Sequence, residues 1–211
     1  MSSGTRKEWA PSSLPQDETA AQRLREWLEE DGGLDAVGLN LSGADLSYGD
    51  FSLSLFIDAK LINTKLVQAE LYRSDAQGAD LSGADLTGSS LVRVNLDEAI
   101  LRNVVLDAAN LGKASLYDVD ASGASCRGTR FMGADLLGVN FRSADLRGAV
   151  FEENSFEVTM DEDTKIEGMT GSVFGPAVVV EGAGPRELSG GELEEWIRSR
   201  GGTVRVIDVS K

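Results

Sequence analysis

The chain has 211 residues, of which 41% are hydrophobic and 26% charged, and its net charge at pH 7 is −15. This composition is typical of a folded domain, and the excess of acid argues against direct binding to nucleic acid or to an anionic membrane surface, because both attract Lys and Arg. A basic protein partner remains compatible with this charge.

Cysteine and histidine usage narrows the chemistry further. The single Cys126 excludes an intramolecular disulfide, as is usual in the cytoplasm. The chain contains no His, so the usual general base and the commonest metal ligand are missing. The first 30 residues lack an apolar signal core, and no run of 18 apolar residues occurs. We therefore expect a cytoplasmic protein without a cofactor and without a membrane partner.

The N-terminal region divides into a tail and a helix. Residues 1–16 are polar with two prolines and predict a flexible tail. Residues 17–31 predict an amphipathic helix that Gly32 and Gly33 end, so residues 17–38 are assigned as a helical N-terminal cap. The apolar face of that helix carries Ala20, Leu24, Trp27 and Leu28.

From Leu41 to Phe156 a large apolar residue recurs at every fifth position without insertion or deletion. The 24 centre positions hold 15 Leu and 6 Phe, and the others are Ala76, Ala121 and Cys126. Two places before the centre, 22 of the 24 residues are small or Val, the exceptions being Leu39 and Asn154. A period of five fits neither an α-helix nor a flat strand, so the pattern predicts a repetitive solenoid.

The pentads resemble those of the pentapeptide-repeat family, whose motif is A-(D/N)-L-x-x. The motif is clearest at residues 79–83 (ADLSG), 84–88 (ADLTG), 134–138 (ADLLG) and 144–148 (ADLRG). The resemblance covers residues 39–158 and implies an all-β fold, a right-handed four-sided β-helix with one pentad per side and 20 residues per coil. On this reading the repeat domain is residues 39–171, with a degenerate last coil in which Ile166 stays in phase.

The residues are consistent with this geometry on their own. One large side chain per pentad can point inward, and the small residue two places earlier fills the interior without overpacking it. The 24 pentads make about six coils, or roughly 29 Å of stacked strands. Gly recurs two places after the centre, as a tight corner with positive φ requires. Cys126 occupies a centre, which favours a buried core residue over a reactive thiol.

Several apolar residues of the first coils are predicted to point outward. We expect the N-terminal helix to cover them, and the alternative is an exposed patch that binds a partner. These residues are Tyr48, Leu53, Leu55, Ile57, Ile62 and Val67.

Residues 172–211 depart from the repeat and predict a small β-α-β-like unit. A strand is expected around Ala177–Val180, a helix opened by a Ser189/Glu192 capping box and running to about Arg200, and a second strand over Thr203–Val209. The unit could cap the far end of the solenoid or form a homodimer.

The charges of the repeat are unevenly distributed over the predicted sides. Side four, defined by the centres at 56, 76, 96, 116, 136 and 156, carries seven acids and no base, and the whole repeat has the same net charge of −7. The three other sides carry mixed charges with net values of +1, −1 and 0. The seven side-four acids are Asp58, Asp75, Asp97, Glu98, Asp118, Asp135 and Glu157.

Motifs for chemistry are weak by comparison. The stretch from Asp161 to Gly168 has part of a calcium-loop pattern, but Lys165 stands where an oxygen ligand belongs. A regular rod offers no deep cleft that could shift the pKa values of its carboxylates. We therefore expect no enzyme activity, no metal and no catalytic residue.

The resemblance also suggests a function. Some pentapeptide-repeat proteins confer quinolone resistance or antibiotic self-immunity, and in that branch an acidic rod mimics duplex DNA and occupies the DNA-binding saddle of gyrase. The side-four acids are then the contact surface for a basic, DNA-binding enzyme. A duplex of 29 Å carries about 17 charges, whereas side four carries seven, so a merely solubilising face is the competing interpretation. The alternative function is a protein-interaction scaffold that uses the terminal apolar surfaces and residues 172–211.

Overall fold

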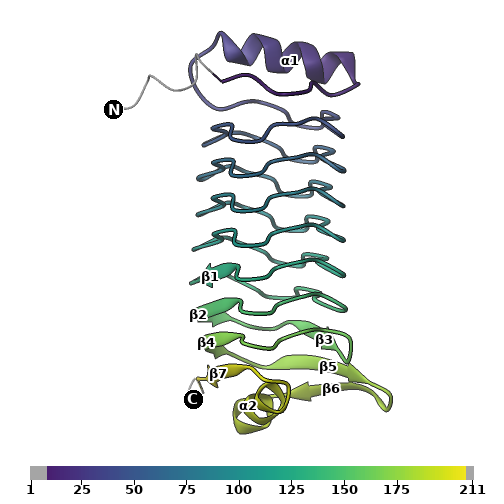
Figure 1. Cartoon of the computed structure of the whole chain (residues 1–211), viewed down its shortest axis with the longest axis vertical. Helices are drawn as coiled ribbons and strands as arrows, with labels where there is room; N and C mark the ends of the chain where they lie inside the picture. The colour runs from purple at the N-terminus through teal and green to yellow at the C-terminus, as the bar shows by residue number, and fades with distance from the viewer. Residues whose placement is uncertain (1–8, 208–211) are drawn as a thin grey trace.

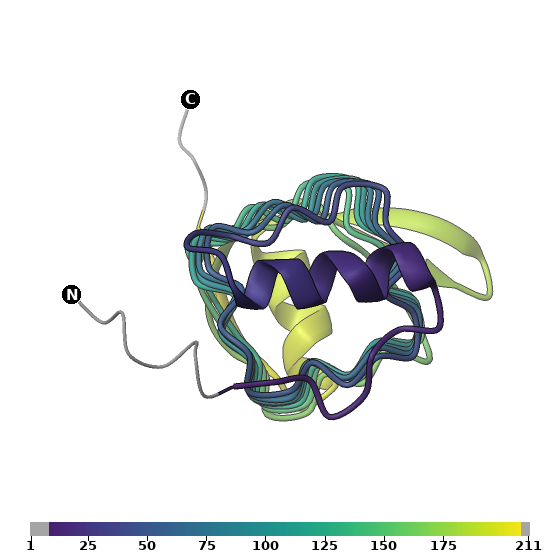
Figure 2. The ribbon, with the colours of Figure 1, turned by 90° about the horizontal axis from the view of Figure 1, so that it is seen from above.

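The computed structural model describes residues 9–207, which form a four-sided tube with a helix at each end. The helix α1 (Glu18–Leu28) lies over the N-terminal end and α2 (Gly190–Ser199) over the C-terminal end (Figure 1). Seen along the tube, successive coils superimpose almost completely (Figure 2). This superposition follows from a constant number of residues per coil.

Backbone hydrogen bonds join residues that lie one coil apart. The ladder of parallel bridges begins where Asp35 pairs with Leu55, and along most of the repeat each bridging residue pairs with the residue 20 positions further on. Within it, the amide of Leu46 donates to the carbonyl of Lys65 at 2.8 Å, and the amide of Lys65 donates to Ala44 at 2.9 Å. Each coil therefore satisfies the backbone groups of its neighbours, as strands do in a sheet.

The predicted interior positions form the core. All 24 pentad centres are buried, and Ala76, the most accessible of them, is only 3% exposed. The residues two places earlier are buried too, except Leu39, which is half-buried. The prediction that Cys126 is a core residue is confirmed, and burial raises the pKa of its thiol.

A turn after nearly every centre before Phe151 gives the tube its corners. The amide three places after the centre donates back to the carbonyl of the centre, as from Gly49 to Leu46. The residue two places after the centre adopts positive φ, which confirms the role predicted for glycine at sites such as Gly78 and Gly83. Fourteen residues other than glycine adopt this conformation as well, with φ between 53° and 65°. Because left-handed backbone costs about 1–2 kcal/mol per residue, the core and the ladder must impose it.

The N-terminal cap packs its apolar face on the open end of the tube. Asp17 caps α1 by accepting from the amide of Ala20 at 2.9 Å. Trp27 stacks on Phe51 with 5.2 Å between ring centroids, and Trp9 packs edge-on against both. The exposed core of the first coil is thus closed by aromatic contacts.

Two sequence predictions about this end need correction. Residues 9–16 are not a free tail, because Ser13 forms an antiparallel bridge with Asp45 and the Trp9 indole donates to the carbonyl of Ser47; residues 1–8 lie outside the described part. The helix also fails to cover the outward apolar residues. It lies over the end of the tube while they face sideways, so Tyr48 is 67% exposed and Leu53 62%.

The regular register is disturbed at the end of the sixth coil, where Asn140 already pairs with Thr159 at a spacing of 19. The strands β1 (Arg130–Met132), β2 (Val150–Ser155), β4 (Thr170–Phe174) and β7 (Thr203–Val206) form one parallel sheet. Val150 pairs with Thr170 at a spacing of 20, whereas Ser155 pairs with Phe174 at 19. Asn154 lies in this bulge fully buried, and its amide nitrogen donates to the carbonyls of Phe131 and Ala134.

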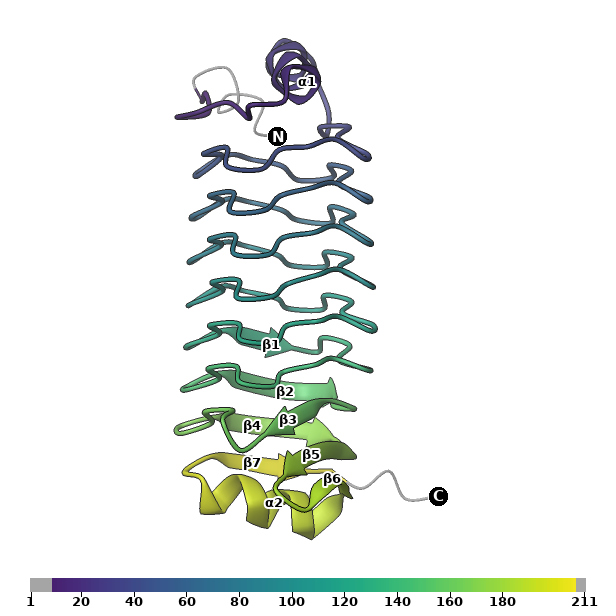
Figure 3. The same cartoon turned by 90° about the vertical axis from the view of Figure 1, so that its right-hand side faces the viewer.

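The C-terminal unit contains the predicted strand, helix and strand, but not as a β-α-β unit. The strands β3 (Thr159–Asp161), β5 (Ala177–Glu181) and β6 (Gly184–Leu188) form a second sheet, in which β5 pairs with the unpredicted β6 as a hairpin. The last strand, β7, pairs instead with β4 of the other sheet. Figure 3 shows these strands stacked below the regular coils, above α2. Residues 208–209 of the predicted last strand lie outside the described residues.

Helix α2 closes the outer edge of β7. The side chain of Glu194 accepts from the amide of Val206 at 2.8 Å, and the amide of Gly202 donates to the carbonyl of Ile197 at 3.0 Å. The predicted capping box is wrong in one respect, since the side chain of Ser189 makes no capping hydrogen bond. Covering an edge strand in this way opposes end-to-end pairing of tubes.

The substitution Asn154→Ala tests the bulge. It leaves two buried carbonyls without their amide donor, so we expect a loss of about 2–3 kcal/mol in the free energy of unfolding. Gln77→Ala, at an exposed position, serves as the control and is expected to change stability by less than about 0.5 kcal/mol. Denaturant unfolding followed by circular dichroism measures both, and equal losses would contradict the role given to Asn154.

Candidate protein-binding surface

The 20-residue register places the side-four acids on one face of the tube. The ladder runs from Leu55 through Asp75, Asn95, Ser115 and Asp135 to Ser155, so each coil contributes to the same column. Asp75 and Asp97 are half-buried, and the five other acids are exposed. The sequence prediction that these residues share a side therefore agrees with their positions in the fold.

Three of the acids, Asp75, Asp97 and Asp135, also join neighbouring coils through one carboxylate oxygen each, and Oδ1 of Asp135 accepts from the hydroxyl of Ser155. Oδ1 of Asp75 accepts from the side chain of Asn95 at 3.0 Å. Oδ1 of Asp97 accepts from the hydroxyl of Ser115 at 2.5 Å and from the amide of Tyr117 at 3.0 Å. Such neutral donors fix the position of a carboxylate while leaving its negative charge in place.

At the following corner, glycines make room for acidic side chains. Asp58 leans over the next coil, so that a Cβ built on Gly78 would lie 2.5 Å from its Oδ1. Asp118 leans in the same way over Gly138. The acids at this corner are therefore directed along the tube axis and extend the charged column from coil to coil.

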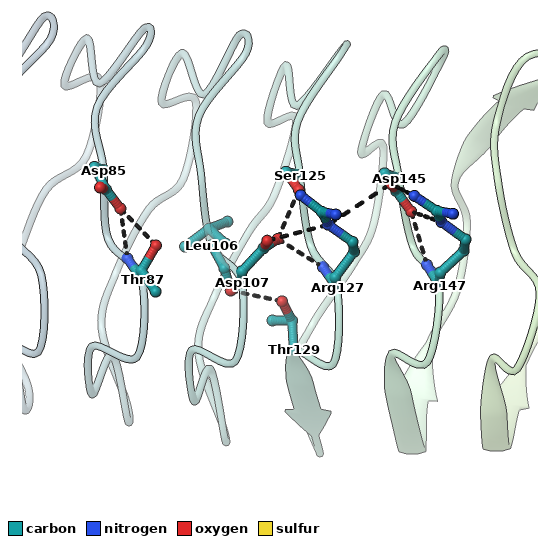
Figure 4. Close-up of polar contacts among 9 residues, drawn as sticks. All are labelled: Asp85, Thr87, Leu106, Asp107, Ser125, Arg127, Thr129, Asp145 and Arg147. Carbon is teal, nitrogen blue, oxygen red and sulfur yellow. Dashed lines mark hydrogen bonds and ion pairs between the residues drawn. The ribbon is translucent and has the colours of Figure 1, made fainter.

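Several acids on sides one and two pair with nearby bases. On side two, Arg127 lies 3.1 Å from Asp107 and 3.8 Å from Asp145, and Arg147 lies 2.6 Å from Asp145 (Figure 4). The hydrogen bond from Arg147 holds the pKa of Asp145 below its ordinary value. On side one, Arg102 contacts Asp120 at 2.5 Å.

Side four differs from these sides in its pairing. Among residues 9–207, none of the seven side-four acids takes part in an ion pair within 4.0 Å. The nearest column of bases in the register is Arg73, Arg93 and Lys113 at the preceding corner, and these bases are likewise outside every ion pair. The acidic column is thus bounded on one flank by positive charge.

The negative charge of the acidic column affects the pKa of Tyr117, whose side chain lies on side four and is 48% exposed. The charge of Asp118, a hydrogen bond with it, desolvation and the charge of Glu98 together raise the pKa of the Tyr117 phenol. A negative potential disfavours the phenolate, which explains the direction.

Other chemistry finds little support in the described part of the chain. No group of three or more His, Cys, Asp or Glu residues there is arranged to hold a metal ion. In the predicted calcium-like stretch, the Asp161 carboxylate accepts from the amide of Ser143 at 2.9 Å and from the hydroxyl of Thr164 at 2.8 Å, so it joins two coils. None of the described helices has the length and apolarity needed to span a membrane.

Comparison with known proteins identifies the repeat. The family model for pentapeptide repeats matches residues 54–91, 89–125 and 114–153, with eight copies. The chain belongs to the pentapeptide-repeat family. Proteins of this family fold as right-handed β-helices and are generally structural or binding proteins rather than enzymes. Among curated proteins, no significant relative was found.

Solved pentapeptide-repeat structures resemble the chain to different degrees. HetL, a protein involved in the regulation of heterocyst differentiation in the cyanobacterium Nostoc sp. strain PCC 7120, is 23% identical over 71% of this chain and 81% of its own, with a TM-score of 0.53. Full-length QnrB1, a plasmid-mediated fluoroquinolone resistance protein, is 19% identical over 68% of this chain and 78% of its own, with a TM-score of 0.34. A thylakoid-lumen protein from Arabidopsis thaliana is 30% identical over 53% of this chain and 67% of its own, with a TM-score of 0.22. The likeness to HetL shows the fold.

The pKa of Tyr117 provides a direct test of the acidic field. Asp118→Asn removes the largest contribution, so we expect the phenol pKa to fall, and added salt should lower it in the unmodified protein for the same reason. Carbon NMR titration of the tyrosine rings measures both effects. Asp145→Asn, on side two, is the control and should leave the titration of Tyr117 unchanged. An unaltered pKa in Asp118→Asn would contradict the account.

Proposed function

We propose that this pentapeptide-repeat protein is a non-catalytic binding protein of the cytoplasm whose side-four acids engage the basic surface of a DNA-binding enzyme. A type II topoisomerase is the partner that the family resemblance favours, and the protein would then act as a regulator or protector by occupying a DNA-binding surface. The observation that carries the proposal is the pairing pattern, because four of the six acids on sides one and two lie in ion pairs, whereas none of the seven on side four does.

The pairing pattern matters because unpaired charge is available to a partner. The charge of a carboxylate held by Arg is already balanced in part, whereas the side-four acids have no paired base and keep their full charge for a cation of the partner. Neutral donors such as Asn95 and Ser115 hold two of them in place. A rigid, pre-positioned row of charge speeds association and loses little conformational freedom on binding.

The charge density agrees with one strand of DNA. From Asp58 to Glu157 the acids span about five coil steps, or roughly 24 Å. Seven charges over that length correspond to about one per 3.4 Å, the density along a single strand of B-DNA and half that of the duplex. Side four would therefore replace one phosphate strand, while the basic column at Arg73, Arg93 and Lys113 limits the width of the contact.

A second candidate function rests on the exposed apolar residues of the first coils. Tyr48, Leu53 and Leu55 are exposed by 67%, 62% and 40%, and α1 does not cover them. A scaffold that binds another protein at this end would bury them. The C-terminal unit contributes less to this alternative, since α2 already covers the edge of β7.

Supercoiling by purified gyrase tests the proposal. We expect the protein at micromolar concentration to inhibit supercoiling or to protect the enzyme from a quinolone. The triple variant Asp97→Asn, Glu98→Gln, Asp118→Asn should lose at least about tenfold in potency, because close charge pairs across an interface couple by about 1.5 kcal/mol or more. The matched control Asp107→Asn, Asp120→Asn, Asp145→Asn removes three acids from sides one and two and should retain activity.

Each outcome of this assay separates the candidates. Equal loss in both triple variants would show that net charge matters and side four does not. Absence of any effect of the unmodified protein on gyrase would refute the topoisomerase proposal, and capture of another protein that is lost in Leu53→Ser would then support the scaffold.

A further inference from the structure

A groove separates α1 from the first turn of the solenoid. Its volume is about 590 Å³, and one wall is the face of α1 that carries Glu18, Arg23 and Glu26. The opposite wall is formed by Asp35, Val37 and Leu39, where the first coil begins. The groove exists because α1 packs Leu24 and Trp27 into the end of the tube and so leaves its neighbouring helical face standing above the coil.

The coil side of this groove is apolar. Val37 is 47% exposed, and Leu39 is the one residue two places before a centre that is not fully buried. The amide of Gly38 donates to the carbonyl of Ile57, and Asp35 bridges Leu55, which is 40% exposed. The apolar surface therefore continues from the groove onto the next coil.

The rim of the groove is acidic. It carries the three carboxylates of Glu18, Glu26 and Asp35 against one cation, Arg23. That cation is already engaged, since its Nη atoms donate to the carboxylate of Glu30 at 2.9 and 3.2 Å and its Nε donates to the carbonyl of Asp35 at 3.2 Å. Glu18 pairs with Arg25 at 3.0 Å and Glu26 with Arg23 at 3.9 Å, but the side chains of Glu18 and Glu26 are 84% and 51% exposed, and exposed pairs of this kind are weak.

The geometry points to a docking site for a short basic and apolar segment of a partner protein, with its aliphatic side chains on Val37 and Leu39 and its Lys or Arg residues at Glu18, Glu26 and Asp35. The stretch of α1 from Glu18 to Glu26 is about 12 Å long, which accommodates three to four residues of extended chain. An acidic segment would be repelled by three carboxylates that only weak surface pairs offset, so charge complementarity selects a basic one. The inference goes beyond the proposed function and does not depend on it.

A fluorescein-labelled synthetic peptide of alternating leucine and lysine is the probe, used with the full-length protein and read by fluorescence anisotropy. We expect saturable binding and no binding of a peptide with glutamate in place of lysine. Val37→Lys should weaken binding at least about tenfold, because it places a cation in the groove. Met132→Lys is the matched control, since Met132 is 38% exposed and, like Val37, directly follows a core residue but lies far from the groove; it should change affinity by less than about twofold.

The side-four triple variant Asp97→Asn, Glu98→Gln, Asp118→Asn distinguishes this site from the acidic column. Binding within about twofold of the unmodified protein supports the groove. Loss of binding in the triple variant with retention in Val37→Lys would place the peptide on side four, which would overturn the groove while leaving the proposed function intact. Failure of the peptide to bind, or equal weakening by Val37→Lys and Met132→Lys, would also overturn it.

Discussion

The hydrogen-bond ladder between residues one coil apart is the constraint on which the rest of the structure depends. A large side chain at the centre of each pentad and a small one two places earlier point inward, and a turn then redirects the chain by one corner. Four turns return it to a position directly below its start, where its backbone pairs with the preceding coil. This closure holds fourteen residues other than glycine at positive φ, a conformation they would not adopt alone.

The ladder also determines how charge is distributed. Residues 20 positions apart stack, so any preference repeated at that interval becomes a column on one wall. On side two the column alternates in sign and neutralises itself, as between Asp107, Arg127 and Asp145. On side four neutral partners such as Asn95 and Ser115 take the place of bases. The same backbone geometry thus produces a neutral wall and an acidic wall.

The sequence predicted the interior and the register because a period of five leaves one solution for which residues are buried. It could not predict where the ends are closed. Trp9 lies outside the periodic part of the sequence, so nothing indicated that its ring packs on Phe51. The hairpin strand β6 contains Pro185 and two charged residues, a composition more typical of a loop. Asn154 was noticed as an exception to the small-residue rule, but only the pairing of Ser155 with Phe174 reveals the bulge that it stabilises. The N-terminal helix was expected to cover the outward apolar residues, because the periodicity does not indicate where that helix packs.

Disulfide trapping tests the register most directly. In a Cys126→Ala background, Glu98→Cys and Asp118→Cys place two thiols at the same corner of adjacent coils, about 4.8 Å apart along the stack, within the range of about 4.4–6.8 Å between Cα atoms that a disulfide spans. The account predicts that mild oxidation gives a quantitative intramolecular disulfide in this variant, detected by mass spectrometry. It predicts none for Glu98→Cys with Ala108→Cys, which lie half a coil apart at opposite corners. A disulfide in the second pair, or none in the first, would contradict the stacking that aligns the acids on side four.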